Sequence, residues 1–268
     1  MLHGQLRMET KYNLPASLKI MPITNTSYGT LEHSRNYTVE YLKEQKKNNP
    51  NYRVIDIGGN ADSWSSVVTD SLVDLNAPES ERSMSFDICD ESQWTKLLKL
   101  VKKQGKFDYC ICTHTLEDLY NPYTALKYIP QIAKEGLITM PSLLTECSRV
   151  ETQKLWRGFS HHRYIFDVNF VDQSMLVIPK MPCIEYILNE YPNAGIEFDK
   201  NFEEIRYHWK EDIAYTNFMD GYIGPTAMII ANAYDGLLQT NLFNILRIQK
   251  ENAPSLPQYE YSFTRQTK

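Results

Sequence analysis

Acidic and glycine residues stand where several apolar segments of the sequence end. Residues 54–57 (VIDI), which include Asp56, are followed by Gly58-Gly59-Asn60, and two later apolar segments end at Asp74 and Asp87. Glycine lets the backbone take positive φ and approach a ligand closely, although a plain tight turn explains this pair equally well. A carboxylate at a strand end can accept hydrogen bonds from both ribose hydroxyls of a nucleoside. The positions gain weight as a ligand site because they recur at successive strand ends.

A second group of residues able to do chemistry lies further along the chain. Residues 156–164 (WRGFSHHRY) contain the adjacent histidines His161 and His162. Histidine has an unperturbed pKa that suits proton transfer near neutral pH, so either ring could be a general base; a structural histidine beside a solvated one is the alternative. Adjacent side chains on a strand point to opposite faces, so at most one is expected to face a pocket. No metal site is predicted, because adjacent histidines seldom share one ion and no carboxylate lies at helical ligand spacing.

The elements that would position these residues alternate between strand and helix. Strands are predicted at residues 52–57, 71–75, 84–88, 107–112 and 136–140, with helices at 34–47, 91–104 and 123–134. Such alternation implies parallel βαβ units. We therefore predict an α/β fold, a Rossmann-like doubly wound and mostly parallel sheet with an antiparallel edge strand. In such sheets ligands bind beyond the carboxyl ends of the strands.

The rest of the chain is predicted to add to this domain. Residues 1–33 indicate an irregular N-terminal leader or cap, 34–180 the Rossmann-like domain, and 181–268 a C-terminal extension that packs on it. Residues 162–170 and 174–180 indicate two antiparallel strands that could close the sheet edge. An apolar helix is predicted within residues 221–248.

Composition limits the classes of function. The chain has 268 residues, and its 28 Lys and Arg against 33 Asp and Glu give a net charge of -5, which argues against a protein that grips phosphate backbones. The five cysteines form no CxxC pair, so neither a disulfide framework nor a zinc site is indicated. No signal-peptide core and no stretch long enough to span a membrane occur, and a cytoplasmic location is expected.

Four sequence segments together resemble a known family of enzymes. In chain order they read VIDIGGN, LVDLN, FDICD and FDYCICTHTLEDLYNP. Their order and spacing are similar to the successive motifs of class I S-adenosylmethionine-dependent methyltransferases of the type 11 group, over roughly residues 35–142. The fourth segment is the most specific, with residues 113–119 preceding Pro122.

The resemblance implies S-adenosylmethionine as cofactor and assigns roles to individual residues. The residues implied in cofactor binding are Asp56, Gly58, Gly59 and Asn60 at the methionine side, Asp74 and Leu75 at the ribose, Asp87 and Ile88 at the adenine, and Thr113 and His114 beside the methyl donor. His114 therefore joins the two adjacent histidines as a catalytic candidate. The sequence departs from the family pattern in two ways. Asn60 and Asp62 occupy places where glycines are usual, and Asp118 stands where a histidine usually follows the Leu-Glu pair.

A further pattern suggests the acceptor. Pro141-Ser142, Glu146 and the SHHRY segment resemble methyltransferase-like proteins associated with polysaccharide modification in bacteria and large DNA viruses. The residues predicted on the acceptor side are Ser142, Glu146, Arg163 and Tyr164. Glu146 and Arg163 could orient a polyol by hydrogen bonds, and Trp156 and Tyr164 could stack on a sugar ring, although core packing is the commoner role of such aromatic residues.

These observations predict an O-methyltransferase that acts on a small-molecule or glycan hydroxyl. Nucleic-acid and membrane partners are not expected, and a homodimer is left open. Three alternatives remain. They are a methyltransferase-like fold without catalysis that serves as a binding or scaffold protein, an NAD-linked sugar-modifying enzyme, and a nucleic-acid methyltransferase. The glycine-poor loop favours the first, the lack of a full GxGxxG fingerprint disfavours the second, and the acidic balance disfavours the third.

Overall fold

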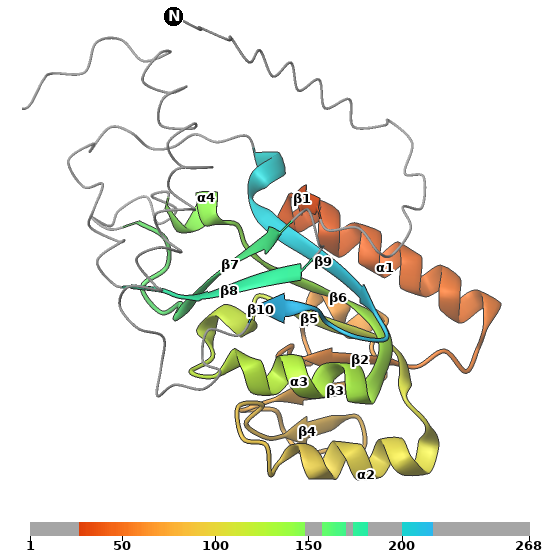
Figure 1. Cartoon of the computed structure of the whole chain (residues 1–268). Coiled ribbons are helices and arrows are strands. Elements are labelled where there is room, and N and C mark those ends of the chain that lie inside the picture. Colours follow the sequence, from red (N-terminus) through yellow and green to blue (C-terminus); the bar gives the residue numbers. More distant parts are fainter. Residues whose placement is uncertain (1–26, 148–156, 170–173, 182–199, 217–268) are drawn as a thin grey trace, which may run out of the picture.

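The computed structural model describes residues 27–147, 157–169, 174–181 and 200–216 (Figure 1). Its strands are β1 (Ser27–Gly29), β2 (Val54–Ile57), β3 (Ser71–Asp74), β4 (Ser83–Ser85), β5 (Phe107–Thr113), β6 (Ala133–Pro141), β7 (Tyr164–Asn169), β8 (Ser174–Pro179), β9 (Glu204–Lys210) and β10 (Tyr215–Thr216). Its helices are α1 (Leu31–Asn48), α2 (Trp94–Gln104), α3 (Pro122–Ile132) and α4 (Leu143–Glu146), with short 3₁₀ turns η1 (Trp64–Val67), η2 (Leu116–Asp118) and η4 (Lys200–Phe202).

A seven-stranded sheet in the order β1-β9-β6-β5-β2-β3-β4 forms the centre of the molecule. The five strands from β6 to β4 are parallel, whereas β9 is antiparallel to β6 and β1 is antiparallel to β9. The predicted α/β, Rossmann-like and mostly parallel architecture is confirmed. The strand order reverses between β2 and β5, and this switch point is where open α/β sheets bind ligands.

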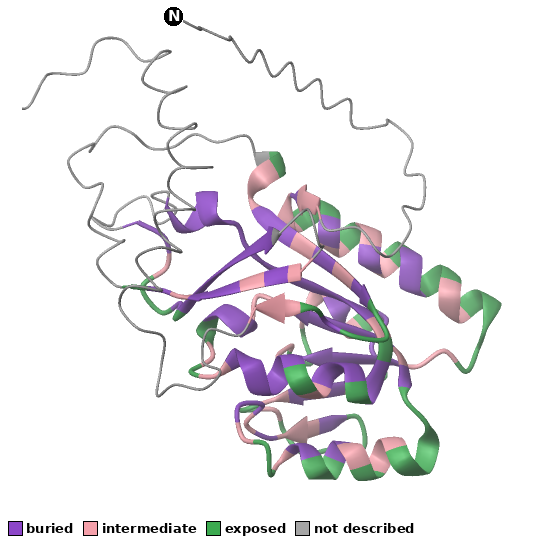
Figure 2. Ribbon diagram, viewed as in Figure 1, coloured by how far each residue is buried: buried purple, intermediate pink, exposed green. Residues whose placement is uncertain are grey.

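Helices cover both faces of the sheet. On one face α1 contributes Tyr41 and Leu42 to a cluster with Val54 and Tyr109. On the other face α2 and α3 pack Trp94 and other apolar side chains on alternate residues of the same strands. Strands β2 and β5 are therefore buried on both sides, as Figure 2 shows, which explains their nearly continuous apolar sequences.

The ends of α1 and α2 follow from their sequences. Helix α1 begins at Leu31, three residues before Ser34, the predicted start of the helix. The side chain of Thr30 accepts a hydrogen bond from the N–H of His33 and caps the helix there. Gly105 ends α2 at φ 82°, a conformation that glycine adopts at little cost. Lysines lie in the last turn of each helix, where the helix dipole favours them.

The predicted antiparallel pair forms, but at another place. Strands β7 and β8 pair antiparallel with each other and belong, with β10, to a separate three-stranded sheet. The antiparallel strands of the main sheet are β9 and β1 instead. Phe166 of β7 and Val177 of β8 are buried in the same core cluster as residues of α3. Their apolar pattern therefore predicts burial but does not show which sheet the two strands join.

The main sheet includes strands from both flanking segments of the chain. β1 comes from the predicted leader and β9 from the predicted C-terminal extension, so the sheet crosses both predicted boundaries. The helix predicted within residues 221–248 and the predicted sugar-stacking residue Trp156 lie outside the described residues. Within the described part of the chain, no helix combines the length and apolarity needed to cross a bilayer.

Candidate functional site

The loop after β2 is closely fitted around Asp56. The carboxylate of Asp56 is buried and accepts a hydrogen bond from the hydroxyl of Ser65 in η1. A Cβ atom on Gly59 would lie 2.2 Å from Oδ2 of Asp56, so only glycine fits there without a shift. Burial, opposed by the Ser65 hydrogen bond and aided by the charge of Asp74, raises the pKa of Asp56 to about 6. A carboxylate that is hard to ionise alone favours a cationic ligand nearby.

Gly58 connects this loop to two neighbouring strands. Its φ is 84°, and its N–H donates to the carbonyl of Val73 at 2.7 Å. A Cβ atom at Gly58 would lie 2.2 Å from the side chain of Thr115, which follows β5. The loop therefore adjoins the end of β5 directly. Asn60, which stands where the family pattern has a glycine, accepts a hydrogen bond from the N–H of Asp62 with its side-chain oxygen at 3.0 Å. This bond closes the turn without a further glycine.

The predicted ribose and adenine residues lie at the next strand ends on the same edge. Asp74 ends β3 and accepts the backbone N–H of Asn76 at 2.8 Å, while the following Leu75 is exposed. Asp87 accepts the backbone N–H of Cys89 at 2.8 Å and the hydroxyl of Tyr120 at 3.2 Å. Ile88 is buried in the core below α2. Because β2, β3 and β4 are parallel, Asp74 and Asp87 follow strands that end at the same edge of the sheet. Their assignment to ribose and adenine stays a prediction.

His114 follows Thr113 at the end of β5 and is fixed by two buried carboxylates. It has φ 50°, its N–H donates to the carbonyl of Thr139, and Nε2 lies 2.9 Å from Oε2 of Glu204 while Nδ1 lies 3.5 Å from Oε1 of Glu117. Burial lowers the pKa of His114, but Glu117 and Glu204 outweigh it and raise the pKa to about 9. The imidazole is therefore cationic near neutral pH. The predicted role of His114 in catalysis does not fit proton acceptance, because its ring already carries the proton.

His161 and His162 both face Asp118, contrary to the expectation that they point apart. They lie in a turn before β7 rather than on a strand, and their ring centroids are 4.5 Å apart. Nε2 of His161 and Nε2 of His162 lie 3.8 and 3.7 Å from Oδ1 of Asp118. The side chain of His161 is 62% exposed, that of His162 only 6%. We refer to Asp118, His161 and His162 as the histidine cluster.

Glu146 contacts His162, the buried histidine of the cluster, at the ring nitrogen that faces away from Asp118. Oε1 of Glu146 lies 2.5 Å from Nδ1 of His162, and Oε2 lies 3.3 Å from the ammonium of Lys180. All three groups are buried. Gly158 lets the backbone pass close by, because a Cβ there would lie 2.4 Å from the carbonyl oxygen of Glu146. His162 thus has a fixed ring orientation, with Nε2 directed to the exposed side of the cluster.

The other predicted acceptor residues have structural tasks. Ser142 is fully buried, caps α4 and donates to the carbonyl of Phe202 at 2.5 Å. Tyr164 is buried against Tyr123 and donates to the carbonyl of Tyr120 at 3.2 Å. Neither of these two side chains faces an acceptor, and Glu146 reaches the site only through His162. Arg163 keeps an exposed side chain, and its N–H donates to the carbonyl of Glu117 at 2.6 Å.

Turn η2 connects the two halves of the site. Thr115, just before η2, packs against Gly58 of the loop after β2, and Asp118, the last residue of η2, faces the histidines. From the sequence, Asp118 was only a departure from the family pattern, and the carboxylates Glu117 and Glu204 were not among the predicted site residues. An acidic pair directly after a strand was the available signal for Glu117 and Asp118. Glu204 had none, because the pairing of β9 with β6 was not predicted.

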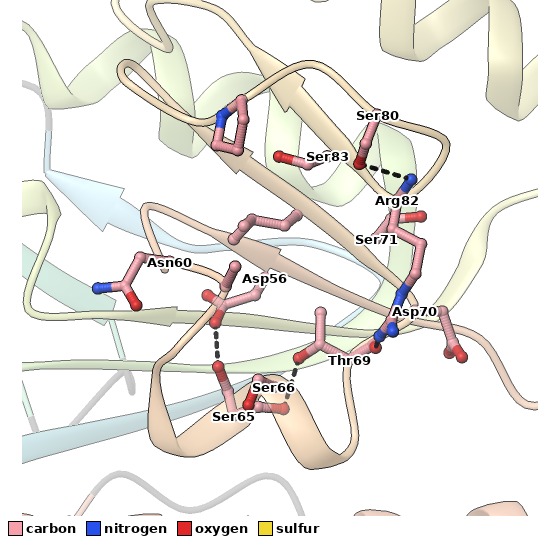
Figure 3. Close-up of a pocket in the computed structure, with 13 residues that line it drawn as sticks. Asp56, Asn60, Ser65, Ser66, Thr69, Asp70, Ser71, Ser80, Arg82 and Ser83 are labelled. Atoms are coloured by element: carbon pink, nitrogen blue, oxygen red, sulfur yellow. Dashed lines mark hydrogen bonds between the residues drawn. The ribbon is translucent and has the colours of Figure 1, made fainter.

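A hydroxyl-rich cavity lies beside the loop on the face of the sheet covered by η1 (Figure 3). Its volume is about 420 Å³. Its polar lining includes Asp56, Asn60, Ser65, Ser66, Thr69, Ser71, Ser80, Arg82 and Ser83. The connection from β2 to β3 contributes η1, whose residues Ser65 and Ser66 line the cavity. Asp74, Asp87 and His114 do not line it, so it meets the strand-end site only at Asp56 and Asn60.

Comparisons with known proteins give similarity to solved structures alone. No family model matches the chain, and no curated protein sequence matches it. The methyltransferase domain of bacterial CtHen1-CN is 15% identical, with 67% of this chain and 98% of that chain covered and a TM-score of 0.34. The N-terminal domain of EvdMO1, crystallised in the presence of SAH and D-fucose, is 10% identical, with 63% and 79% covered and a TM-score of 0.28. Values this low carry no weight in the assignment of residues.

Proposed function

We propose that this chain is an S-adenosylmethionine-dependent O-methyltransferase whose acceptor is a hydroxyl of a sugar or glycan. The observation that carries the proposal is the position of η2. It separates, by one turn of chain, a loop and acidic strand ends suited to a nucleoside from a histidine cluster suited to proton transfer. Methyl transfer needs both on one edge of the sheet, because the donor and the acceptor oxygen must meet in line.

The cofactor side of the proposal rests on Asp56, Asp74 and Asp87. The amino group and sulfonium of S-adenosylmethionine are cationic, and a buried Asp56 carboxylate would gain from either charge. Asp74 would accept hydrogen bonds from the ribose hydroxyls, and Asp87 would accept a hydrogen bond from the adenine amino group. Gly58 and Gly59 would allow the backbone to approach the methionine portion.

The acceptor side of the proposal rests on His162. Glu146 holds Nδ1, so Nε2 is the nitrogen that faces an incoming hydroxyl. An imidazole held in this way can take the hydroxyl proton as the methyl group moves from sulfur to oxygen. His161 and Arg163 are both exposed and would contact the polyol.

Calorimetric titration with S-adenosylhomocysteine tests the cofactor side. We expect saturable binding to the wild type, loss of binding in Asp74→Ala, and unchanged binding in Glu81→Ala, which removes an exposed carboxylate of the β3–β4 connection. A wild type that fails to bind millimolar ligand would contradict the proposal.

Transfer of a labelled methyl group to bacterial polysaccharide fractions tests the acceptor side. His162→Gln should keep cofactor binding and reduce transfer by about 100-fold or more, within the usual contribution of general acid–base catalysis. Binding without transfer to any hydroxyl acceptor would favour the alternative of a methyltransferase-like binding or scaffold protein.

A further inference from the structure

The histidine cluster brings three metal-binding side chains to one point. One donor atom from each of Asp118, His161 and His162 lies within 4.8 Å of the other two. The two distances to Oδ1 of Asp118, 3.7 and 3.8 Å, are too long for hydrogen bonds. The groups therefore converge at ion-pair distance without hydrogen bonds to one another, and this arrangement suits a shared partner.

We propose that Asp118, His161 and His162 bind one divalent first-row transition-metal cation. Metal–nitrogen and metal–oxygen bonds of about 2.0–2.2 Å place two donors on a common ion about 3.0–3.5 Å apart. The donor atoms, which lie within 4.8 Å of one another, would therefore have to approach by at most about 2 Å. Two imidazoles with one carboxylate favour such cations over Mg²⁺, which prefers oxygen ligands.

The contacts of His162 support this role independently of the spacing. In metal sites a histidine that binds through one ring nitrogen almost always gives its other N–H to a carboxylate or carbonyl, which fixes the tautomer. Nδ1 of His162 has this partner in Glu146 at 2.5 Å, and Lys180 holds the second carboxylate oxygen. The nitrogen left for a cation is Nε2, the atom that faces Asp118.

Exposure and neighbouring side chains leave room for a further ligand. The side chains of Asp118 and His161 are 45% and 62% exposed, and the ring centroid of Phe159 lies 4.6 Å from that of His162. A cation with three protein ligands keeps open coordination positions. They would face the same side as the proposed acceptor.

The consequence for the reaction rests on the proposed function and changes one part of it. A hydroxyl oxygen bound to the cation would lose its proton to water more readily, because the positive charge stabilises the alkoxide. That oxygen would attack the methyl carbon, and the C–S electron pair would remain on sulfur as the neutral thioether. His162 would then hold the cation rather than accept the proton, while the cofactor residues keep their roles.

Titration of the full chain with Co²⁺ and Zn²⁺, after dialysis against a chelator, tests the site without any methyl transfer. We expect visible Co²⁺ absorption that saturates at one equivalent and is displaced by Zn²⁺, with much weaker binding of Mg²⁺. Asp118→Asn and His161→Gln should each weaken Co²⁺ binding at least tenfold. Both residues are exposed, so these variants should fold, and thermal unfolding curves would verify this.

Two further variants separate a metal site from general loss of charge. Glu146→Gln should weaken Co²⁺ binding about 10- to 100-fold, the usual effect of losing an outer hydrogen bond to a ligand. His33→Gln changes an exposed histidine on α1 and should leave binding unchanged. Absence of saturable Co²⁺ binding, or equal affinity in wild type and Asp118→Asn, would overturn the proposal.

Parallel titration with S-adenosylhomocysteine distinguishes this inference from the proposed function. Binding of S-adenosylhomocysteine without Co²⁺ binding would refute the cation site alone. Co²⁺ binding without S-adenosylhomocysteine binding would refute the proposed function and leave the cation site standing. Full methyl transfer in the presence of chelator would overturn the part assigned to the cation in the reaction.

Discussion

His114 shows how two neighbours decide the charge of a single residue. Its ring contacts Glu204 at 2.9 Å and Glu117 at 3.5 Å, and the pKa of His114 rises from its ordinary 6.5 to about 9. The residue is therefore a cation near neutral pH, beside a loop proposed to hold another cation. The two carboxylates compensate for this charge, so His114 orients the end of β5 rather than exchanging protons.

Replacement of His114 by Gln should change how stability depends on pH. A histidine with a raised pKa stabilises the fold fully below pH 6.5, and this contribution is lost as the pH rises through 9. Between these limits the wild type should lose about 3 kcal/mol of unfolding free energy relative to His114→Gln. Urea unfolding at several pH values measures this difference. Parallel curves for the two proteins would contradict the assigned charge.

Gly59→Ala should show that the cofactor loop is fitted to Asp56. The added Cβ would lie 2.2 Å from Oδ2, so the loop or the carboxylate must move. We expect a loss of about 1–3 kcal/mol of stability, typical of overpacking, together with weaker binding of S-adenosylhomocysteine.

A double-mutant cycle with Asp56→Ala provides the control for this clash. Asp56→Ala removes the carboxylate that the new methyl group meets. The loss of stability in the double mutant should therefore be smaller than the sum of the losses in the two single mutants. Strict additivity would show that the methyl group harms the loop in another way.

At the scale of elements, the sequence predicted those whose partners are local. Strands β2, β3 and β5 and helices α2 and α3 carry clear periodicity, and turn residues such as Gly105 mark their ends. The insertion of β9 between β6 and β1 was not predictable, because strand pairing across more than sixty residues leaves no local pattern. The same reason applies to the candidate site. Asp56 and Asp74 could be proposed from local sequence because each stands at the end of an apolar segment, whereas Glu204 approaches His114 only through the pairing of distant strands.

Gly136→Ala tests the close packing of β6 between β5 and β9. A Cβ there would lie 2.2 Å from the backbone carbonyl oxygen of Cys110 and 2.9 Å from Nε1 of Trp209. A backbone atom in a central sheet cannot yield easily, so we expect a loss of about 3 kcal/mol or more. Lys134→Ala, at an exposed site of the same strand, should cost less than about 1 kcal/mol. Comparable unfolding curves for the two variants would contradict the pairing of β6 with β5.

At the scale of the whole molecule, the proposed ligand site depends on strands from distant parts of the chain. Its floor comes from β2, β3 and β5, and Glu204 of β9 fixes His114 above β5. We therefore expect a ligand to bind at this edge only when the sheet is complete. Its binding energy should stabilise the described sheet as one cooperative unit.

S-adenosylhomocysteine at about 100 times its dissociation constant should raise the free energy of unfolding by about 2.7 kcal/mol. For a domain of this size the melting temperature should rise by several degrees, in one transition. Asp74→Ala should abolish the shift, because the proposed ribose contact is lost, whereas His162→Gln should retain it, because that ring lies beyond η2 on the acceptor side. A shift that persists in Asp74→Ala would place the ligand elsewhere. The hydroxyl-rich cavity beside η1 would then be the alternative site, and Ser83→Ala should reduce the shift.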